Sequence, residues 1–342
     1  MNTGLRGNNE HVTRPVSMRD VASRAGVAVS TVSRAFAEPD RINAETRALV
    51  MLAAEELGYQ MKPATPRRSN RRKLVALLVP DITNPFYFDI IRGSRERLLD
   101  SGYMQVSVNT EGSGEEERVA LESLTGVVQG AILTTSRLAD EEVRAFAREM
   151  PLVTLNGSIK GIPDISIDTA SVVGEAVEHL ASLGHRRICY VSGPTQSVVN
   201  RRRWNSFQDS AEALGLEATR IGPFSPRQGS GAVSADEMLA SGATATVAFN
   251  DILAIEMLQR FAELGVRVPD DVSIVGCDDI VGSAFCYPPL TTISAPALRV
   301  GRELTSLLLA AIDGTDDELA TDLEMPVHLK IRSSTGPAPR SF

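Results

Sequence analysis

The spacing of hydrophobic residues changes at about residue 73 of the chain. Between residues 18 and 58, apolar residues recur every three or four positions, which is typical of short amphipathic helices. After residue 73, short apolar runs follow one another, and each leaves room for a helix before the next. This alternation predicts parallel sheet covered on both faces, and about 260 residues with eight or more strands favour two α/β subdomains over one sheet. The runs are KLVALLV, MQVSVNT, GAILTT, LVTLN, DISID, RRICYVSG, ATVAFND and VSIVGCDD.

The N-terminal part predicts three short helices around a small core. Ser17 and Asp20 form an S-x-x-D capping box at the start of a first helix, Met18 to Ala25, and a glycine supplies the turn after it. A second helix runs from about Val29 to Ala37, and an asparagine caps a third helix, AETRALVMLAAEEL. The residues expected on the helices' apolar faces are Val21, Ala22, Ala25, Val32, Ala35, Phe36, Leu49, Leu52, Ala53 and Leu57.

The second of these helices, VSTVSRAFA, is rich in small hydroxyl side chains and carries an arginine. In a helix-turn-helix, the second helix lies in the major groove of DNA with its N-terminal residues against base edges. Hydroxyls reach phosphates or bases, valine contacts a thymine methyl group, and arginine suits a phosphate or a guanine. The alternative is an ordinary surface helix with capping hydroxyls. The candidate DNA contacts from this pattern are Val29, Ser30, Thr31, Ser33 and Arg34.

The distribution of charge changes what the net charge of −8 indicates. Residues 1–73 hold 13 Lys and Arg against 7 Asp and Glu, a net charge of +6, whereas the remainder carries −14. A basic head on an acidic body is expected when only one end of a protein meets phosphate. A solvated basic tail is the other interpretation.

The composition argues against several other classes of protein. No apolar run approaches the roughly 20 residues that span a bilayer, and the polar start MNTGLRGNNEHVTRPVS does not resemble a secretory signal, so we expect a cytoplasmic protein that does not contact a membrane. The three cysteines, Cys189, Cys277 and Cys286, form no CxxC pair and are expected to be reduced. The four histidines lack the i, i+4 spacing of a zinc site. We therefore expect no metal and no cofactor.

Longer motifs stand in a fixed order from Met18 to about Thr335. They are DVASRAGVAVSTVSRAF, INAETRALVMLAAEELGY, PDITNPFYFDIIRG, LASLGHRRICYVSG, AFNDILAIEML, VPDDVSIVGCDD and PPLTTI. The first two resemble the headpiece, and the others the core, of the lactose-repressor (LacI/GalR) family of bacterial transcription regulators. The resemblance implies an N-terminal all-α helix-turn-helix headpiece plus an α/β core of two doubly wound subdomains similar to periplasmic sugar-binding proteins.

The resemblance also implies boundaries. We expect a disordered tail (1–17), the headpiece (18–58), a basic hinge (59–73), an effector-binding core (74–335) and a C-terminal tail (336–342). Within the core, the expected N-subdomain comprises about 74–168 and 294–324, and the C-subdomain about 169–293 and 325–335.

The mechanism that the resemblance implies is allosteric. A homodimer places two headpieces on a near-palindromic operator in double-stranded DNA. A small effector, a sugar or a derivative, binds between the core subdomains and changes operator affinity. We therefore expect a transcription regulator that acts as a repressor. The residues after HLKIRSST are too few for a tetramerising coiled coil, so we expect a dimer.

Residue by residue, the family's base-reading positions fall on Val29 and Ser30, and its phosphate contacts fall on Ser17 and Arg41. The hinge departs from the family pattern PNxxAxxL, because Arg68 stands at the leucine that wedges into the minor groove and Pro66 lies two residues before it. A leucine wedge kinks DNA, whereas arginine suits a narrow, A·T-rich minor groove. We therefore expect weaker operator bending, or a hinge that folds differently.

The family's effector pocket maps onto six residues: Phe86, Tyr87, Asn156, Arg203, Asn250 and Asp278. An arginine forks two hydroxyls or a carboxylate, aspartate and asparagine accept hydrogen bonds from sugar hydroxyls, and aromatic rings offer a flat apolar face. Each has an ordinary alternative. The aromatic pair could be core, the aspartate a helix cap, the asparagine at 250 a turn residue, and the arginine a surface ion-pair partner.

Two departures from the family affect this pocket. The sequence RWNSF places Trp204 and Ser206 where the family often has R-x-x-G-F, which would crowd the pocket. Cys277 replaces an aromatic residue and would enlarge it.

Three other kinds of protein compete with this interpretation. An enzyme would need catalytic motifs such as a nucleophile elbow, HExxH or a P-loop, which the chain lacks. A periplasmic solute-binding protein would need a signal sequence and no headpiece. The third alternative is a transcription regulator whose core binds a protein partner or a non-sugar metabolite.

Overall fold

The structure is a computed structural model of the 342-residue chain and describes residues 16–37, 42–59, 73–315 and 322–340. The chain divides into two compact units, Met1–Asn70 and Arg71–Phe342, and each is described by itself. The expected tail up to residue 15, Arg41, and the hinge residues 60–72 with Pro66 and Arg68 lie outside the described residues.

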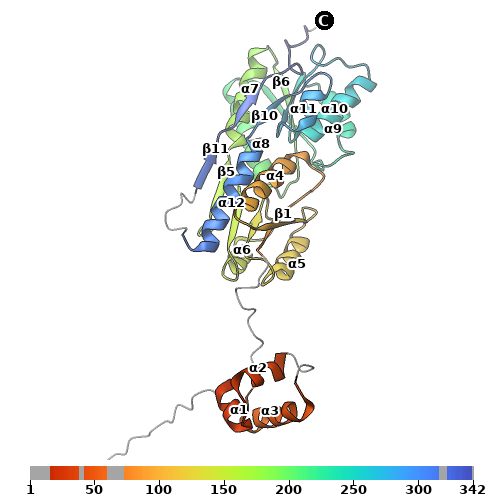
Figure 1. Ribbon diagram of the computed structural model, residues 1–342. Coiled ribbons are helices and arrows are strands. Elements are labelled where there is room, and N and C mark those ends of the chain that lie inside the picture. The colour runs from red at the N-terminus through yellow and green to blue at the C-terminus, as the bar shows by residue number, and fades with distance from the viewer. Residues whose placement is uncertain (1–15, 38–41, 60–72, 316–321, 341–342) are drawn as a thin grey trace, which may run out of the picture. The chain divides into compact units, whose positions relative to one another are not determined.

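The described part of the first unit contains three helices: α1 (Met18–Ala25), α2 (Val29–Ala37) and α3 (Ala44–Glu56) (Figure 1). At the start of α1, the backbone N–H and the hydroxyl of Ser17 both donate to Asp20 Oδ2, at 2.7 and 2.6 Å. Gly26 ends α1 with φ of 68°, a left-handed conformation that glycine adopts without strain. Asn43 Oδ1 accepts from the N–H of Thr46 at 2.7 Å and caps α3. The predicted helices and their caps are therefore present.

The predicted core face of α3 is confirmed only in part, because Ala53 is buried and Leu57 packs against the headpiece core, whereas two predicted leucines do not. Val50, Ala53 and Ala54 are buried, whereas Leu49 and Leu52 are 50% and 56% exposed. The run ALVMLAA is apolar on several faces, so its period does not select one, and the two small alanines allow α3 to pack closely against its neighbours. On α1 and α2 the prediction is confirmed, because Val21, Ala22, Val32 and Ala35 are buried together and Ala25 and Phe36 pack against them.

The second unit, the core, contains two six-stranded sheets in its described residues. The first has the order β11-β5-β4-β3-β1-β2 and is parallel throughout. The second has the order β12-β10-β9-β8-β6-β7 and is parallel except for β12, which runs antiparallel to β10. The strands of the first sheet are β1 (Leu74–Val79), β2 (Met104–Asn109), β3 (Ala131–Leu133), β4 (Leu152–Leu155), β5 (Asp164–Ile167) and β11 (Asp322–Met325). Those of the second are β6 (Arg187–Val191), β7 (Glu217–Ile221), β8 (Ala245–Ala248), β9 (Ser273–Cys277), β10 (Thr291–Ser294) and β12 (His328–Lys330).

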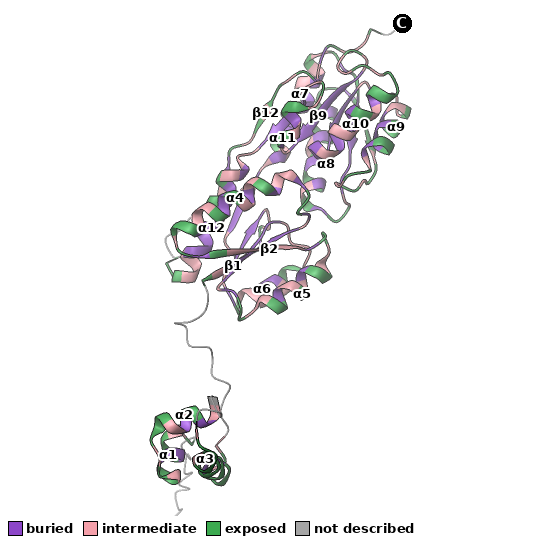
Figure 2. Ribbon diagram, turned by 45° about the vertical axis from the view of Figure 1, so that its right-hand side comes forward, coloured by how far each residue is buried: buried purple, intermediate pink, exposed green. Residues whose placement is uncertain are grey.

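Helices cover both faces of each sheet, with their buried sides toward the strands and exposed sides outward (Figure 2). The chain passes between the two sheets after β5, after β10 and between β11 and β12. The helices are α4 (Pro85–Asp100), α5 (Gly114–Leu124), α6 (Asp140–Ala147), α7 (Thr169–Ser182), α8 (Val198–Ala213), α9 (Gly231–Ala240), α10 (Asp251–Glu263), α11 (Val281–Phe285) and α12 (Ala297–Asp313). This is the predicted arrangement of two doubly wound α/β subdomains.

One predicted connection is wrong. The sequence pattern leaves room for a helix between every pair of apolar runs, but β4 and β5 are joined by a loop and still pair in parallel. Side chains close this loop: Asp164 Oδ1 accepts from the hydroxyl of Thr154 at 2.6 Å and from the N–H of Gly157 at 2.8 Å. The loop carries Asn156 at its start, with a positive φ of 57°.

Candidate functional site

Helix α2 presents the predicted DNA-contacting residues on its outer side. Val29 is 42% exposed, Ser30 and Arg34 are exposed, and Thr31 and Ser33 are half-buried. Val32 and Ala35 point the other way, into the headpiece core. Ser17 differs from these residues, because its hydroxyl already donates to Asp20 at the start of α1.

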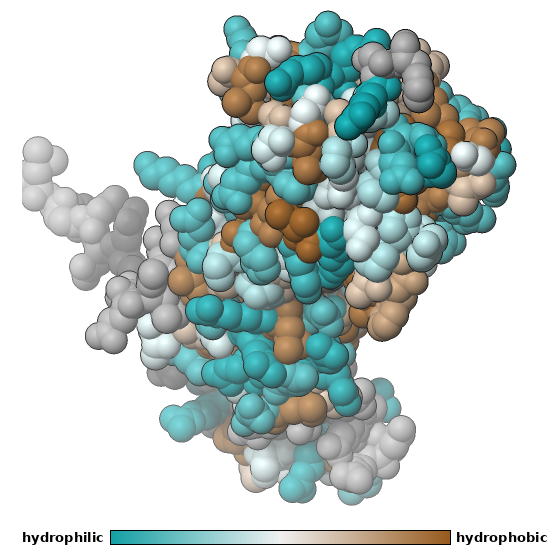
Figure 3. All heavy atoms as spheres, turned by 90° about the horizontal axis from the view of Figure 1, so that it is seen from above, coloured by the Kyte–Doolittle hydropathy of each residue, from teal (hydrophilic) through white to brown (hydrophobic). Residues whose placement is uncertain are grey.

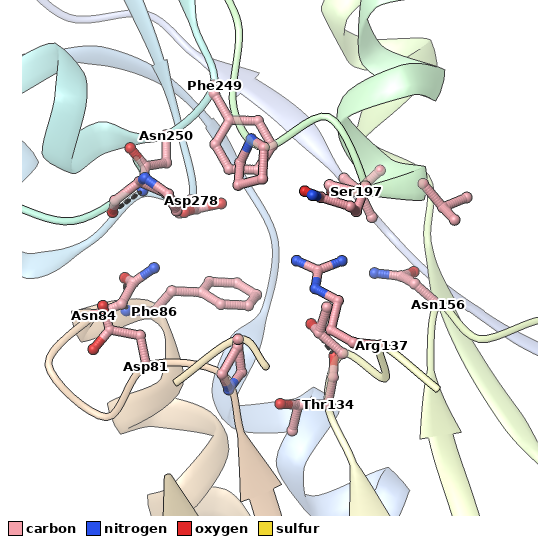
Figure 4. A pocket seen from close by; sticks show the side chains of 18 of the residues that line it. Asp81, Asn84, Phe86, Thr134, Arg137, Asn156, Ser197, Phe249, Asn250 and Asp278 are labelled. Carbon is pink, nitrogen blue, oxygen red and sulfur yellow. Dashed lines mark hydrogen bonds between the residues drawn. The ribbon is translucent and has the colours of Figure 1, made fainter. Parts of the chain in front are cut away.

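The core contains a cavity of about 940 Å³, which we call the cleft. Its walls come from loops and helix starts that follow strands of both sheets (Figure 4). Open α/β sheets bind ligands at the carboxyl ends of their strands, so this position fits a ligand site. All six predicted effector residues line it: Phe86, Tyr87, Asn156, Arg203, Asn250 and Asp278.

Arg203 is a buried member of the cleft wall. Its side chain extends from α8, and Arg203 is only 6% exposed. Nε donates to the hydroxyl of Thr169 at 2.9 Å, and Nη1 donates to the carbonyl of Phe249 at 2.6 Å. Nη2 lies 3.8 Å from Asp278 Oδ1. The guanidinium therefore joins three segments of the second half of the core, and the surface ion-pair alternative does not describe it.

Asp278 faces the cleft, whereas its neighbour Asp279 contacts other residues of the core. Burial raises the pKa of Asp278 to about 7, against the opposing charge of Arg203. Asp279 accepts from Ser294 at 2.8 Å and pairs with Lys330 at 3.2 Å and Arg332 at 2.5 Å. Helix α11 begins after Ile280 without a side-chain cap, so neither aspartate caps it. Asp278 is thus a carboxyl that changes protonation near neutral pH beside a buried cation.

The two asparagines differ in how much of their amide remains for a ligand. Asn250 Oδ1 accepts from the N–H of Leu253 at 3.0 Å, and its Nδ2 donates to the carbonyl of Pro226 at 3.0 Å. Asn156 Oδ1 accepts from the N–H of Ile167 at 2.7 Å, while its amide nitrogen points into the cleft (Figure 4). Asn250 therefore shapes the start of α10, and Asn156 offers a donor to the cavity.

The aromatic pair belongs both to the core and to the cleft. The rings of Phe86 and Tyr87 lie edge to face, with centroids 5.3 Å apart. Tyr87 is buried in the cluster under α4, and its hydroxyl lies 3.3 Å from Thr135 Oγ1. Burial raises the pKa of Tyr87 to about 12, so its hydroxyl stays neutral. Phe86 extends into the cavity as an apolar surface (Figure 4).

The two departures from the family pattern change the core rather than the cleft. Trp204 stacks against Phe207 at 5.9 Å and packs on Tyr190 at 5.8 Å. Cys277 is 1% exposed in the same apolar cluster. Neither of them, nor Ser206, is among the residues that line the described cavity.

Sequence reasoning missed two arginines of the cleft. Arg227 follows β7 and bridges the halves of the core: its Nε lies 3.4 Å from Asp81 Oδ2 and its Nη1 2.7 Å from Glu111 Oε2. Arg137 follows β3, and its guanidinium points into the cavity (Figure 4). For Arg137 the available signal was its place in the loop after a predicted strand. Arg227 follows β7, which carries no apolar pattern, so the sequence offered no such signal for it.

Among the described residues, no helix is both long and apolar enough to cross a bilayer. No group of three His, Cys, Asp or Glu side chains in the same residues is placed to hold a metal ion.

Comparisons with known proteins cover both units. Residues 17–61 match the family described as bacterial regulatory proteins, lacI family, and residues 177–335 match a periplasmic binding protein-like domain. The HTH-type transcriptional repressor CytR of Escherichia coli (strain K12) is 31% identical over 332 residues, which cover 94% of this chain and 97% of CytR.

Two solved structures resemble most of the chain. A complex of the transcriptional regulator CelR with cellobiose has a TM-score of 0.67 and 30% identity, covering 94% of this chain and 100% of that one. The lac repressor dimer bound to operator and the anti-inducer ONPF has a TM-score of 0.68 and 28% identity, with the same coverage.

Proposed function

Because the chain belongs to the LacI family of bacterial regulatory proteins, it is a DNA-binding transcriptional regulator, and we propose that it acts as a repressor controlled by a small polar effector in the cleft. The observation that carries the proposal is the cleft itself, which is lined from both sheets of the core. A ligand that contacts both halves binds one relative placement of them better than another, and this difference in affinity drives a switch.

We propose a sugar or a sugar derivative as the effector. The cleft combines one apolar ring surface, that of Phe86, with charged and amide groups, including Arg203, Asn156 and Asp278. That mixture suits a polyhydroxylated ligand. The related CelR structure contains cellobiose, which supports this class without identifying the ligand.

On the DNA side, we propose that Val29 and Ser30 read base edges, with Thr31, Ser33 and Arg34 beside them. Ser17, Arg41 and Arg68 are proposed to contact the DNA backbone or the minor groove. The proposed operator is near-palindromic, because a two-fold dimer presents two copies of α2. The site of action is the cytoplasm.

A homodimer is supported by exposed apolar side chains on the core. Val281, Phe285, Tyr287 and Ile331, on or next to the second sheet, are 70%, 82%, 93% and 59% exposed. Figure 3 looks down on the end of the core that holds this sheet and shows hydrophobic patches among hydrophilic side chains. Apolar surface of this kind marks interaction sites, and the related lac repressor structure is a dimer on its operator.

The test has two stages. Selection from random-sequence DNA with the purified full-length protein yields an operator, whose binding is then followed by fluorescence anisotropy. A thermal-shift panel of monosaccharides, polyols, sugar acids and nucleosides identifies ligands that raise the unfolding midpoint with concentration. The proposal requires a ligand that changes operator affinity and loses this effect with Asp278→Ala. If no ligand does so while operator binding is intact, a protein partner or a non-sugar metabolite controls the core.

A further inference from the structure

The cleft is lined by three carboxyl and three guanidinium groups, but these groups are not paired one to one. They are Asp81, Glu111, Arg137, Arg203, Arg227 and Asp278. Arg227 is within ion-pair distance of both Asp81 and Glu111, and Arg203 lies beside Asp278. Among the residues that line the described cavity, this leaves Arg137 as the cation without a carboxylate partner.

The carboxyl that lies close to Arg137 is held by the backbone. Glu117 of α5 is 2% exposed, and its Oε2 accepts from the backbone N–H of Arg137 at 2.7 Å. Burial raises the pKa of Glu117, and the hydrogen bond from the backbone of Arg137 and the charge of Arg137 oppose that rise. This hydrogen bond fixes the loop that follows β3. Arg137 is half-buried, and its guanidinium points into the cavity (Figure 4). The loop therefore presents Arg137 to the cleft.

The surroundings of this guanidinium are rich in donors. Figure 4 shows it pointing toward Ser197 at the start of α8, with the amide nitrogen of Asn156 on one side. The first turn of α8 carries no acidic residue, so the positive end of its dipole is not neutralised there. Asp278 lies toward the other side of the cavity in the same view. A ligand group that satisfies these donors has to supply acceptor oxygens, and a negatively charged group satisfies the arginine best.

We propose that Arg137 is the centre of an anion-binding subsite in the cleft, and that the effector carries a carboxylate or a phosphate group in addition to its hydroxyls. The inference rests on the proposed function in one respect, namely that the cleft is the effector site. A guanidinium forks two oxygens of either group, so the two chemistries share one recognition mode. Asn156 and the first turn of α8 would contact the same group.

The first experiment probes the subsite without knowledge of the effector. Inorganic phosphate is titrated at constant ionic strength into the full-length protein, into Arg137→Gln and into Arg148→Gln, with thermal unfolding as the readout. Arg148 is exposed at the end of α6, so its variant loses the same charge outside the cleft. We expect the midpoint to rise with phosphate in the parent and in Arg148→Gln, with roughly tenfold weaker binding in Arg137→Gln. Equal shifts in all three proteins, or no shift in the parent, overturn the proposal.

The second experiment separates carboxylate from phosphate. Glucose, glucuronate and glucose 6-phosphate are compared at equal concentration, as are ribose and ribose 5-phosphate. Tighter binding of an acidic member than of its neutral parent, with the preference lost in Arg137→Gln and partly kept in Arg137→Lys, supports the subsite and identifies its chemistry. If neutral and acidic members bind alike, or if Arg137→Gln keeps the preference, the anion subsite is wrong, whereas the effector cleft still stands. The phosphate titration tests the subsite even if no sugar regulates operator binding.

Discussion

The outer face of α2 and the cleft are two binding surfaces of one chain, built in opposite ways. The α2 surface consists of exposed or half-buried residues that lie close together on one short helix, namely Val29, Ser30, Thr31, Ser33 and Arg34. The cleft brings together residues as distant in sequence as Phe86 and Asp278, and several of them are buried and hydrogen-bonded to other parts of the core.

Because of this difference, a substitution on α2 should change binding without changing stability, whereas a substitution in the cleft should change both. The candidate DNA-contacting side chains on the outer face of α2 lie outside the buried headpiece cluster, so their replacement should change DNA affinity alone. The cleft side chains also hold segments of the core together, so their replacement should change stability and ligand affinity at once. Substitutions on each surface, with matched controls, test that distinction.

The largest effect is expected for Arg203→Met. The substitution removes hydrogen bonds to Thr169 and to the carbonyl of Phe249 and leaves Asp278 without its counter-charge. Breaking a buried pair in this way costs about 3 kcal/mol of the free energy of unfolding. Urea unfolding followed by the fluorescence of Trp204, the single tryptophan, measures the loss. Arg202→Met, on the exposed position before it, should change stability by less than about 0.5 kcal/mol; equal losses in the two variants would show that Arg203 has no special structural role.

A second prediction concerns the pH dependence of stability. Burial raises the pKa of Asp278 to about 7 from 3.8, so the folded protein holds this proton more tightly than the unfolded chain does. The contribution of Asp278 to the free energy of unfolding therefore falls as pH rises from about 4 to about 7. Asp278→Asn removes this contribution, so the free energy of unfolding should fall less steeply over that pH range.

The surroundings of Asp278 determine how the pH experiment is interpreted. Arg203 opposes the pKa rise, and Asp251, whose own pKa burial raises to about 6, adds to it. Asp251 remains in Asp278→Asn, so a shallower fall of the same sign should persist. Unfolding curves of both proteins at several pH values measure the two slopes, and identical slopes would mean that Asp278 titrates normally.

Much of the fold was predictable because hydrophobic spacing reports burial directly. The eight apolar runs are β1 to β6, β8 and β9. The strands β7, β10, β11 and β12 are not among these runs. The strand β7 was missed because EATRI forms an exposed edge with no apolar pattern. The buried face of α3 was predicted only in part, because its apolar residues surround the helix. Tertiary packing buried Val50 and Ala54 beside the predicted Ala53.

The two surfaces were predictable to different extents for the same reason. The α2 residues are contiguous, so one stretch of sequence displays them together. The six cleft residues could be named only through resemblance to a family, since no local pattern connects Asn156 with Asp278. Arg137 and Arg227 lie in loops without hydrophobic periodicity, and only the convergence of strand ends in three dimensions places them in the cavity.

A third prediction concerns the exposed surface of α2. Arg34→Ala should weaken operator binding roughly tenfold, because a charged contact to phosphate or guanine is lost, while the core's urea unfolding midpoint stays unchanged. Anisotropy titrations over a range of salt concentrations measure both affinity and salt dependence. Arg34→Lys separates the two kinds of contact: lysine keeps a phosphate interaction but loses a forked contact to guanine. Operator binding by Arg34→Ala equal to that of the parent would contradict the assignment of this residue.

The smallest effect is expected for Arg227→Ala, because the Arg227 side chain is partly exposed to solvent. Arg227 bridges Asp81 and Glu111 across the two halves of the core, but its side chain is 40% exposed, and water screens such ion pairs. Arg227→Ala should therefore weaken ligand binding by no more than about fivefold, because pairs of this kind contribute up to about 1 kcal/mol. The difference from the parent should shrink as salt is added. Calorimetric titrations at low and high salt measure the difference.

Arg260→Ala provides the control, since Arg260 also pairs with two carboxylates, those of Asp236 and Glu263, outside the cleft lining. Weaker binding in Arg227→Ala alone would mean that ligand affinity depends on this bridge between the halves of the core, whereas equal affinities in both variants would mean that the cleft holds its ligand without it.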